Sequence, residues 1–120
     1  MRMTYELTEV QDILVVSIKG NPGVDDIKHI LDRIRNESGY SHSARLWDFQ
    51  ESSFSFSQNE VLDIAAYAST GDIRPAKVAM LVKEDLSFGV SRIYEVFRNT
   101  DLTETNVFRD KTEALAWLRA

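Results

Sequence analysis

Four serines and three phenylalanines gather in one short stretch, DFQESSFSFSQNE, which runs from Asp48 to Glu60. A serine hydroxyl can act as a nucleophile, accept a phosphate or cap a helix. Ser57 is followed three residues later by Glu60, which is the spacing of a capping box. Phe54 and Phe56 alternate with serines. In an extended loop both rings face the same way, either under the loop or along an apolar pocket or partner surface.

The other reactive side chains form no catalytic motif. The chain lacks G-x-S-x-G, G-x-G-x-x-G and the Walker spacing of glycines. His29 and His42 have no partner histidine one helical turn away, so a metal site is not expected. Without cysteine there is no disulfide, zinc–thiolate site or thiol catalysis. The sequence therefore predicts a protein that is not an enzyme and holds no metal or cofactor.

Two pairs of adjacent carboxylates stand out. Asp25 and Asp26 lie where a helix is predicted to begin, and negative charge suits that end of the helix dipole. Glu84 and Asp85 follow an apolar run that predicts a central parallel strand. Open α/β sheets bind ligands at the carboxyl ends of their strands, so this second pair marks a candidate ligand site.

Length and charge limit the function classes. A chain of 120 residues fits one domain, residues 1–120, and 43% hydrophobic with 28% charged residues is ordinary for a globular protein. The formal net charge is −5 and the basic residues are scattered, so nucleic-acid binding is not expected. No apolar stretch approaches the ~20 residues of a membrane span, and the start has no signal-peptide core. We predict a cytoplasmic protein.

Hydrophobic periodicity predicts five strands and four helices in the order ββαβαβαβα. The strands are expected around Tyr5 to Leu7 and over Ile13–Ile18, Ala44–Phe49, Val78–Val82 and Asn106–Phe108. The helices are expected over Val24–Ile34, from Ser57 onward, over about Ser87–Asn99 and up to Leu118. Strands that alternate with helices imply right-handed crossovers. The predicted class is α/β, a mostly parallel sheet with an N-terminal hairpin and helices on its faces.

The last third of the chain resembles the C-terminal half of the SpoIIAA-like, STAS/SEC14-type bacterial proteins. The features that carry this resemblance are the apolar strand Val78-Ala79-Met80, the acidic turn Glu84-Asp85, the helix start Phe88-Gly89 with Arg92, and VFRD…EALAWL over Val107–Leu118. The upstream order of hairpin, helix, strand and Ser/Phe loop is also similar. The resemblance implies the fold of anti-sigma-factor-antagonist domains. Its SEC14 side implies lipid or other apolar ligands.

The same resemblance implies a phosphorylation switch, but the motif differs. In that family a strand-end Asp leads to a serine at a helix start, which a partner kinase phosphorylates to switch partner binding. Laid on this chain, Asp48 matches the strand-end Asp and Ser57 falls near the serine. However, Phe56 precedes Ser57 where the family has Asp, and Gln58-Asn59-Glu60 replaces Ser-Gly-Leu. The phosphorylation motif is therefore missing, and the capping box explains Ser57.

Two functions stay open. The first is a non-catalytic interaction or regulatory module that binds an unknown protein partner or a second copy of itself. The alternative is a protein that binds a small apolar or anionic ligand at the carboxyl ends of the parallel strands. The candidate surface comprises Asp48, Phe54, Phe56, Ser57, Asp85, Phe88 and Arg92.

Overall fold

The computed structural model describes residues 3–36, 44–70, 75–98 and 103–120, so His42 and Asn99 lie outside the described residues. The elements are β1 (Met3–Val10), β2 (Ile13–Gly20), α1 (Val24–Asn36), β3 (Ala44–Ser52), α2 (Gln58–Ser69), β4 (Ala76–Val82), α3 (Asp85–Arg98), β5 (Thr103–Phe108) and α4 (Lys111–Arg119). This order and the α/β class confirm the prediction. No helix in the described ranges is long and apolar enough to cross a membrane.

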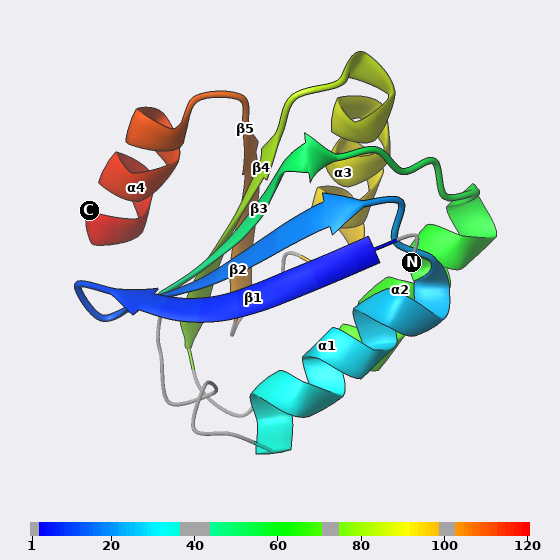
Figure 1. Ribbon diagram of the computed structural model, residues 1–120, viewed down its shortest axis with the longest axis horizontal. Helices are drawn as coiled ribbons and strands as arrows, with labels where there is room; N and C mark the ends of the chain where they lie inside the picture. Colours follow the sequence, from blue (N-terminus) through cyan, green and yellow to red (C-terminus); the bar gives the residue numbers. More distant parts are fainter. Residues whose placement is uncertain (1–2, 37–43, 71–74, 99–102) are drawn as a thin grey trace.

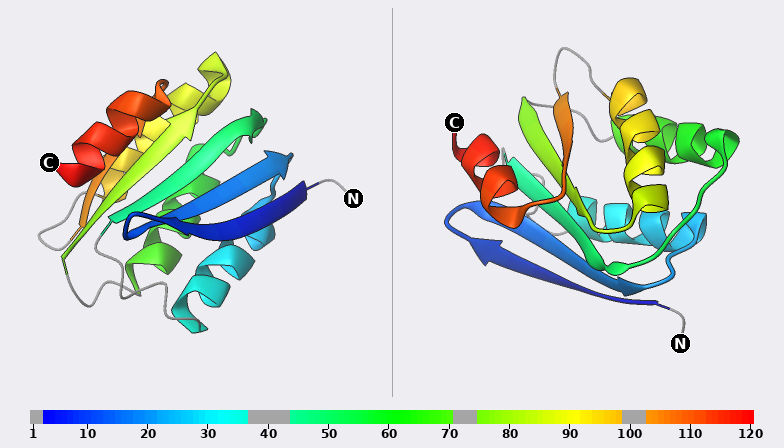
Figure 2. Two further views of the ribbon diagram at one scale, coloured as in Figure 1. Left: turned by 60° about the vertical axis from the view of Figure 1, so that its left-hand side comes forward. Right: turned by 90° about the horizontal axis from the view of Figure 1, so that it is seen from above.

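The strands follow one another across the sheet in sequence order, β1-β2-β3-β4-β5. β1 and β2 form the antiparallel hairpin, and every later neighbour is parallel. Right-handed crossovers that all step in one direction place their helices on the same face of a sheet. Accordingly, α1, α2 and α3 cover one face and α4 covers the other (Figures 1 and 2).

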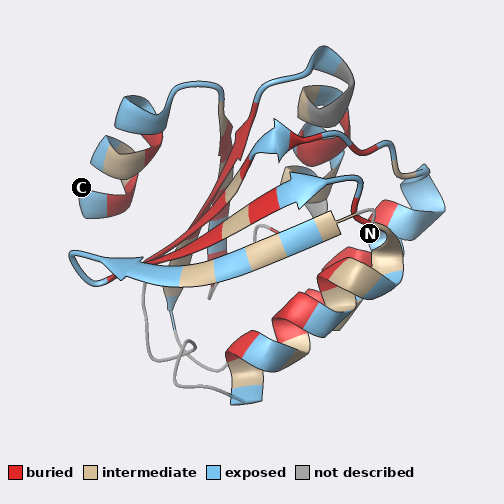
Figure 3. Ribbon diagram, viewed as in Figure 1, coloured by how far each residue is buried: buried red, intermediate tan, exposed pale blue. Residues whose placement is uncertain are grey.

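Each face of the sheet has its own core. The three-helix face buries Val16, Trp47 and Met80, whereas the α4 face buries Leu46 and Leu81. This division follows from the two-residue alternation of side chains along a strand. All residues from Val78 to Val82 are buried, as predicted for a parallel strand covered on both sides, and Figure 3 shows buried residues concentrated in the central strands.

β3 is longer than predicted, because it keeps pairing with β2 beyond Phe49. The register shifts by one residue between the pairs Ser17–Asp48 and Lys19–Glu51, which is a β-bulge in β3. The Ser52 hydroxyl donates to the Ile18 carbonyl at 2.6 Å. A bulge bends its strand and increases the local twist. The chain then returns over the sheet face, and Phe54 contacts Phe49 edge to face at 4.9 Å between ring centroids.

Polar side chains on α1 and α2 fasten the two helices together outside the core. The Lys28 ammonium donates to Asp63 at 2.9 Å, and the Tyr67 hydroxyl donates to Asp32. The Arg35 guanidinium donates to the Tyr67 carbonyl and lies over the Tyr67 ring, 4.8 Å from its centroid. These contacts fix the spacing of α1 and α2 above the sheet.

This set of contacts makes a prediction for alkaline pH. The hydrogen bond to Asp32 raises the pKa of Tyr67, and the hydrogen bond to Asp63 raises the pKa of Lys28. Both groups hold their protons more tightly in the folded protein. They therefore stabilise it below about pH 10, and this stabilisation is lost as the pH rises through the raised values.

We expect Tyr67→Phe to lower the free energy of unfolding at about pH 8, and the deficit relative to wild type to shrink above about pH 10. Urea denaturation of both proteins across this pH range measures the difference. A deficit of constant size up to about pH 11 would show that the Tyr67 proton does not contribute.

Candidate functional site

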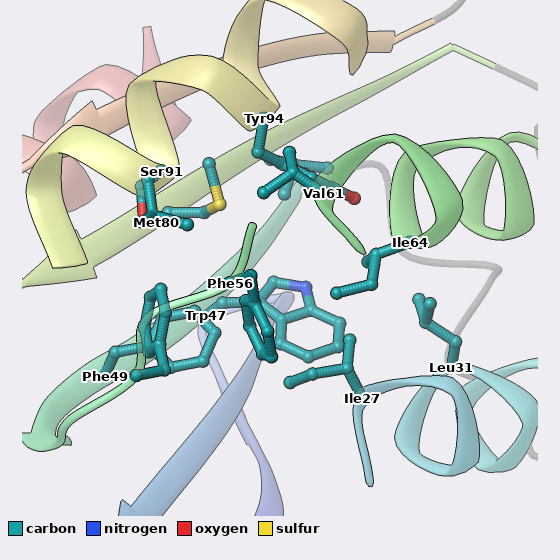
Figure 4. A pocket seen from close by; sticks show the side chains of 13 residues that line it. Ile27, Leu31, Trp47, Phe49, Phe56, Val61, Ile64, Met80, Ser91 and Tyr94 are labelled. Atoms are coloured by element: carbon teal, nitrogen blue, oxygen red, sulfur yellow. The ribbon is translucent and has the colours of Figure 1, made fainter. Parts of the chain in front are cut away.

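An apolar cavity of about 60 Å³ lies between the three-helix layer and the sheet (Figure 4). Its wall is built from β3, β4, the β3–α2 loop and the inner faces of α1, α2 and α3. The lining residues are Ile27, Leu31, Trp47, Phe49, Phe54, Phe56, Val61, Ile64, Val78, Met80, Val90, Ser91 and Tyr94. None of these described side chains carries a charge.

A chain of aromatic contacts forms the floor and one side of the cavity. Trp47 stacks on Phe49 with ring centroids 6.1 Å apart, and Phe54 stacks on Phe56 at 5.4 Å. The edge-to-face contact between Phe49 and Phe54 joins the two pairs. Such geometries stabilise aromatic pairs beyond the area that they bury. The Ser/Phe loop is thereby packed onto the sheet, and its rings both close the core and line the cavity.

Helical spacing supplies the rest of the wall. Ile27 and Leu31 are one turn apart on α1, and Val90 and Tyr94 are one turn apart on α3. Among the lining residues only Phe56 and Tyr94 are half-buried, so the cavity approaches the surface beside them. The Tyr94 hydroxyl accepts a hydrogen bond from Arg98 Nε at 3.2 Å.

A second, polar hollow lies at the carboxyl ends of β2, β3 and β4. It is wide open to solvent, with a volume of about 630 Å³. Its lining residues are Gly20, Asn21, Gln50, Glu51, Ser52, Ser53, Lys83, Glu84 and Asp85. The Ser53 hydroxyl donates to Glu84 at 3.0 Å, and Glu51 pairs with Lys19 at 3.4 Å. Within the described residues no group of three His, Cys, Asp or Glu side chains could hold a metal ion.

Asp48 and Ser57 have structural partners. Asp48 lies in the middle of β3, so its expected place at the end of the strand is wrong, because the bulge lets β3 continue to Ser52. It shares the α4 face with Leu46, and its Oδ1 accepts from the Gln50 amide at 3.0 Å. Ser57 caps α2: its hydroxyl accepts from the Glu60 amide at 3.2 Å, while Glu60 accepts from the Ser57 amide. The predicted capping box is confirmed.

The remaining candidate residues outside the apolar cavity are Asp85, Phe88 and Arg92, and they lie in two places. Arg109 joins Asp85 and Phe88: its guanidinium pairs with Asp85 at 2.7 Å and lies over the Phe88 ring, 4.4 Å from the centroid. Arg92 is exposed and pairs with Glu95 at 3.0 Å. Of the seven candidate residues, Phe54 and Phe56 line the apolar cavity and Asp85 lines the polar hollow, so the structure does not bring them together in one site.

Sequence reasoning missed the contributions of α3 and β3 to the cavity. Val90, Ser91 and Tyr94 face it from α3, and Trp47 faces it from β3. The one-turn spacing of Val90 and Tyr94 and the alternation of Trp47 with Phe49 are signals that place these side chains on inner faces. Those signals indicate burial, but they do not reveal that space is left over between the buried groups.

Large hydrophobic side chains are also exposed on the outside of the helix layer. Of the four such residues among those described, Leu62 lies on α2 and Ile93 and Val96 lie on α3. Val96 is 71% exposed. α2 and α3 pack against each other. We call Leu62, Ile93 and Val96 the α2–α3 surface.

Solved structures share this fold. An anti-sigma factor antagonist from Mycobacterium paratuberculosis matches with a TM-score of 0.71 and 13% identity, over 98% of this chain and 95% of that chain. An uncharacterized DUF3478 protein from Shewanella loihica, described as having a SpoIIAA-like fold, matches with a TM-score of 0.61 and 21% identity, over 97% and 93%. The anti-sigma factor antagonist SpoIIAA in its unphosphorylated form matches with a TM-score of 0.58 and 15% identity, over 97% of this chain and 96% of that chain.

No protein-family profile and no curated protein matches the sequence. The structural matches cover nearly the whole chain. They confirm the fold that the sequence resemblance implied: the chain has a SpoIIAA-like, STAS-type fold.

The Ser57 cap can be tested by substitution. We expect Ser57→Ala to lower the free energy of unfolding by about 1 kcal/mol, because it removes the acceptor for the Glu60 amide. Ser57→Asp should retain most of the stability, since Asp is also a strong N-cap residue. Urea denaturation gives both values, and Ser55→Ala in the same exposed loop is the control. A Ser57→Ala protein as stable as wild type would contradict the structural role.

Proposed function

We propose that this chain is a non-catalytic regulatory module, one domain over residues 1–120, that binds a partner protein through the α2–α3 surface. The observation that carries the proposal is the placement of three of the four exposed large hydrophobic side chains on two helices that pack together. Contiguous exposed apolar patches on soluble proteins mark interaction sites, and we propose that these three side chains form one. The fold likeness supports it, because two of the matched structures are anti-sigma factor antagonists, which act on proteins.

The charged groups at the strand ends favour this function over catalysis. Ser53 bonds to Glu84, Asp85 pairs with Arg109, and Arg92 pairs with Glu95. Paired side chains of this kind position loops and helices. The hydrophobic residues on the outer helix surfaces have no comparable structural explanation.

Charge selects the kind of partner. The formal net charge is −5. A second copy of the chain would bring the same negative charge, whereas a basic partner is attracted. The occupant that fits is therefore a different protein, with apolar side chains bordered by Lys or Arg.

Val96→Glu tests the surface, because Val96 is 71% exposed and its replacement leaves the core intact. Val10→Glu is the matched control, since Val10 is the fourth exposed large hydrophobic and lies at the end of β1. A partner protein that the wild-type chain retains from a cell lysate is purified. Calorimetry then measures the affinity of this partner for the wild-type chain, for Val96→Glu and for Val10→Glu. We expect Val96→Glu to weaken binding at least about tenfold and Val10→Glu to leave it unchanged.

Equal affinities for all three proteins would refute the assigned surface. Sedimentation equilibrium tests the alternative that the chain binds a second copy of itself. A wild-type dimer that Val96→Glu converts to a monomer would replace the proposed partner with a second copy of this chain.

A further inference from the structure

Gly89 is an exposed glycine in the first half of α3, and no contact within the described residues requires it. Unlike Gly20, whose φ of 93° favours glycine, Gly89 has an ordinary helical backbone. It is exposed, and a Cβ built on it would meet no neighbouring atom within 4 Å. Glycine is a much poorer helix former than alanine, because it loses more backbone freedom on folding. Gly89 therefore lowers the stability of the free chain for no reason found in its packing.

The position of Gly89 extends the α2–α3 surface along α3. Gly89, Ile93 and Val96 have the spacing i, i+4, i+7, which places them on one stripe of the helix. Val90, which follows Gly89, is buried and faces the core, so the stripe lies on the outer side of α3. Leu62 is exposed on α2, which packs against α3. The surface therefore joins large apolar side chains to a stretch of backbone that no side chain covers.

This combination suits contact with another helix. A glycine on a helix face lets a second backbone approach closely, and small residues at a helix crossing shorten the distance between the axes. Apolar side chains with the spacing i, i+4, i+7 are the usual anchors where an amphipathic helix docks on another helical surface. An exposed glycine that weakens the free helix is therefore explained by a partner backbone that passes over it.

We propose that the partner docks an amphipathic helix on this stripe and that the backbone of this helix crosses α3 at Gly89. The inference rests on the proposed function, because it assigns one contact within the partner surface. Ile93 and Val96 contact the apolar face of the partner helix, and a Gly, Ala or Ser of that helix lies against Gly89. The net charge of −5 favours Lys and Arg on its polar face.

The stability of the free chain gives the first readout. Gly89→Ala and Gly89→Leu should both raise the midpoint of urea denaturation, because Ala and Leu are better helix formers and a Cβ at this position meets open space. A lower midpoint for Gly89→Ala would show that the fold itself needs the glycine, and it would overturn the proposal.

The binding readout uses a phage-displayed library of lysine-rich amphipathic helices with randomised apolar positions, selected on the wild-type chain. We expect the selected helices to carry Gly, Ala or Ser at one apolar position. As synthetic peptides they should bind Gly89→Ala about fivefold and Gly89→Leu at least about fiftyfold more weakly than wild type. Thr112→Leu is the control, since it adds the same side chain at an exposed position of α4, and it should bind them as wild type does.

Failure of this contact and failure of the partner surface give different results. Helices that bind Val96→Glu weakly but bind both Gly89 variants as tightly as wild type would leave the surface in place and overturn the crossing at Gly89. A loss with Gly89→Leu alone would also overturn it, because a backbone contact leaves no room for the methyl group of alanine. Selection of no helix, or of helices insensitive to all these substitutions, would overturn the helical partner, while calorimetry with the retained partner protein still tests the surface.

Discussion

The order of the strands governs the rest of the structure. Because the sheet runs β1-β2-β3-β4-β5, every crossover steps in the same direction, and α1, α2 and α3 lie on one face. Among the described helices, α4 alone covers the opposite face. The three-helix face is filled by large aromatic side chains, with Trp47, Phe49, Phe54 and Phe56 in consecutive ring contact. The apolar cavity is the space left where the sheet and three helices meet.

The order of the strands also bears on where the candidate functional sites lie. Open α/β sheets bind ligands at the point where the strand order reverses, and the order of the five described strands does not reverse. The polar hollow at the strand ends is open, and Glu51, Glu84 and Asp85 in its wall each bond to a neighbouring side chain. The apolar features instead belong to the helix layer. The cavity is on its inner side and the α2–α3 surface is on its outer side.

The helix cap and the burial of the central strand could be predicted from the sequence, but the bulge and the cavity between the layers could not. The Ser57–Glu60 spacing predicted the capping box, and the unbroken run Val78–Val82 predicted a strand buried on both faces. The bulge after Asp48 was missed because the residues Gln50 to Ser52 are polar, and their pairing depends on β2. The cavity was missed for a related reason. The spacing of Trp47, Val90 and Tyr94 shows which side chains point inward. Only the assembled sheet and helices show that space is left between these side chains.

The most direct measurement of the central feature is a crystal of the protein held under xenon pressure. Xenon occupies dry apolar cavities. One xenon atom should appear between Trp47, Phe56 and Val61, on the three-helix face. Electron density showing side chains packed together there, or xenon only between α4 and the sheet, would contradict a cavity produced by the three helices on one face.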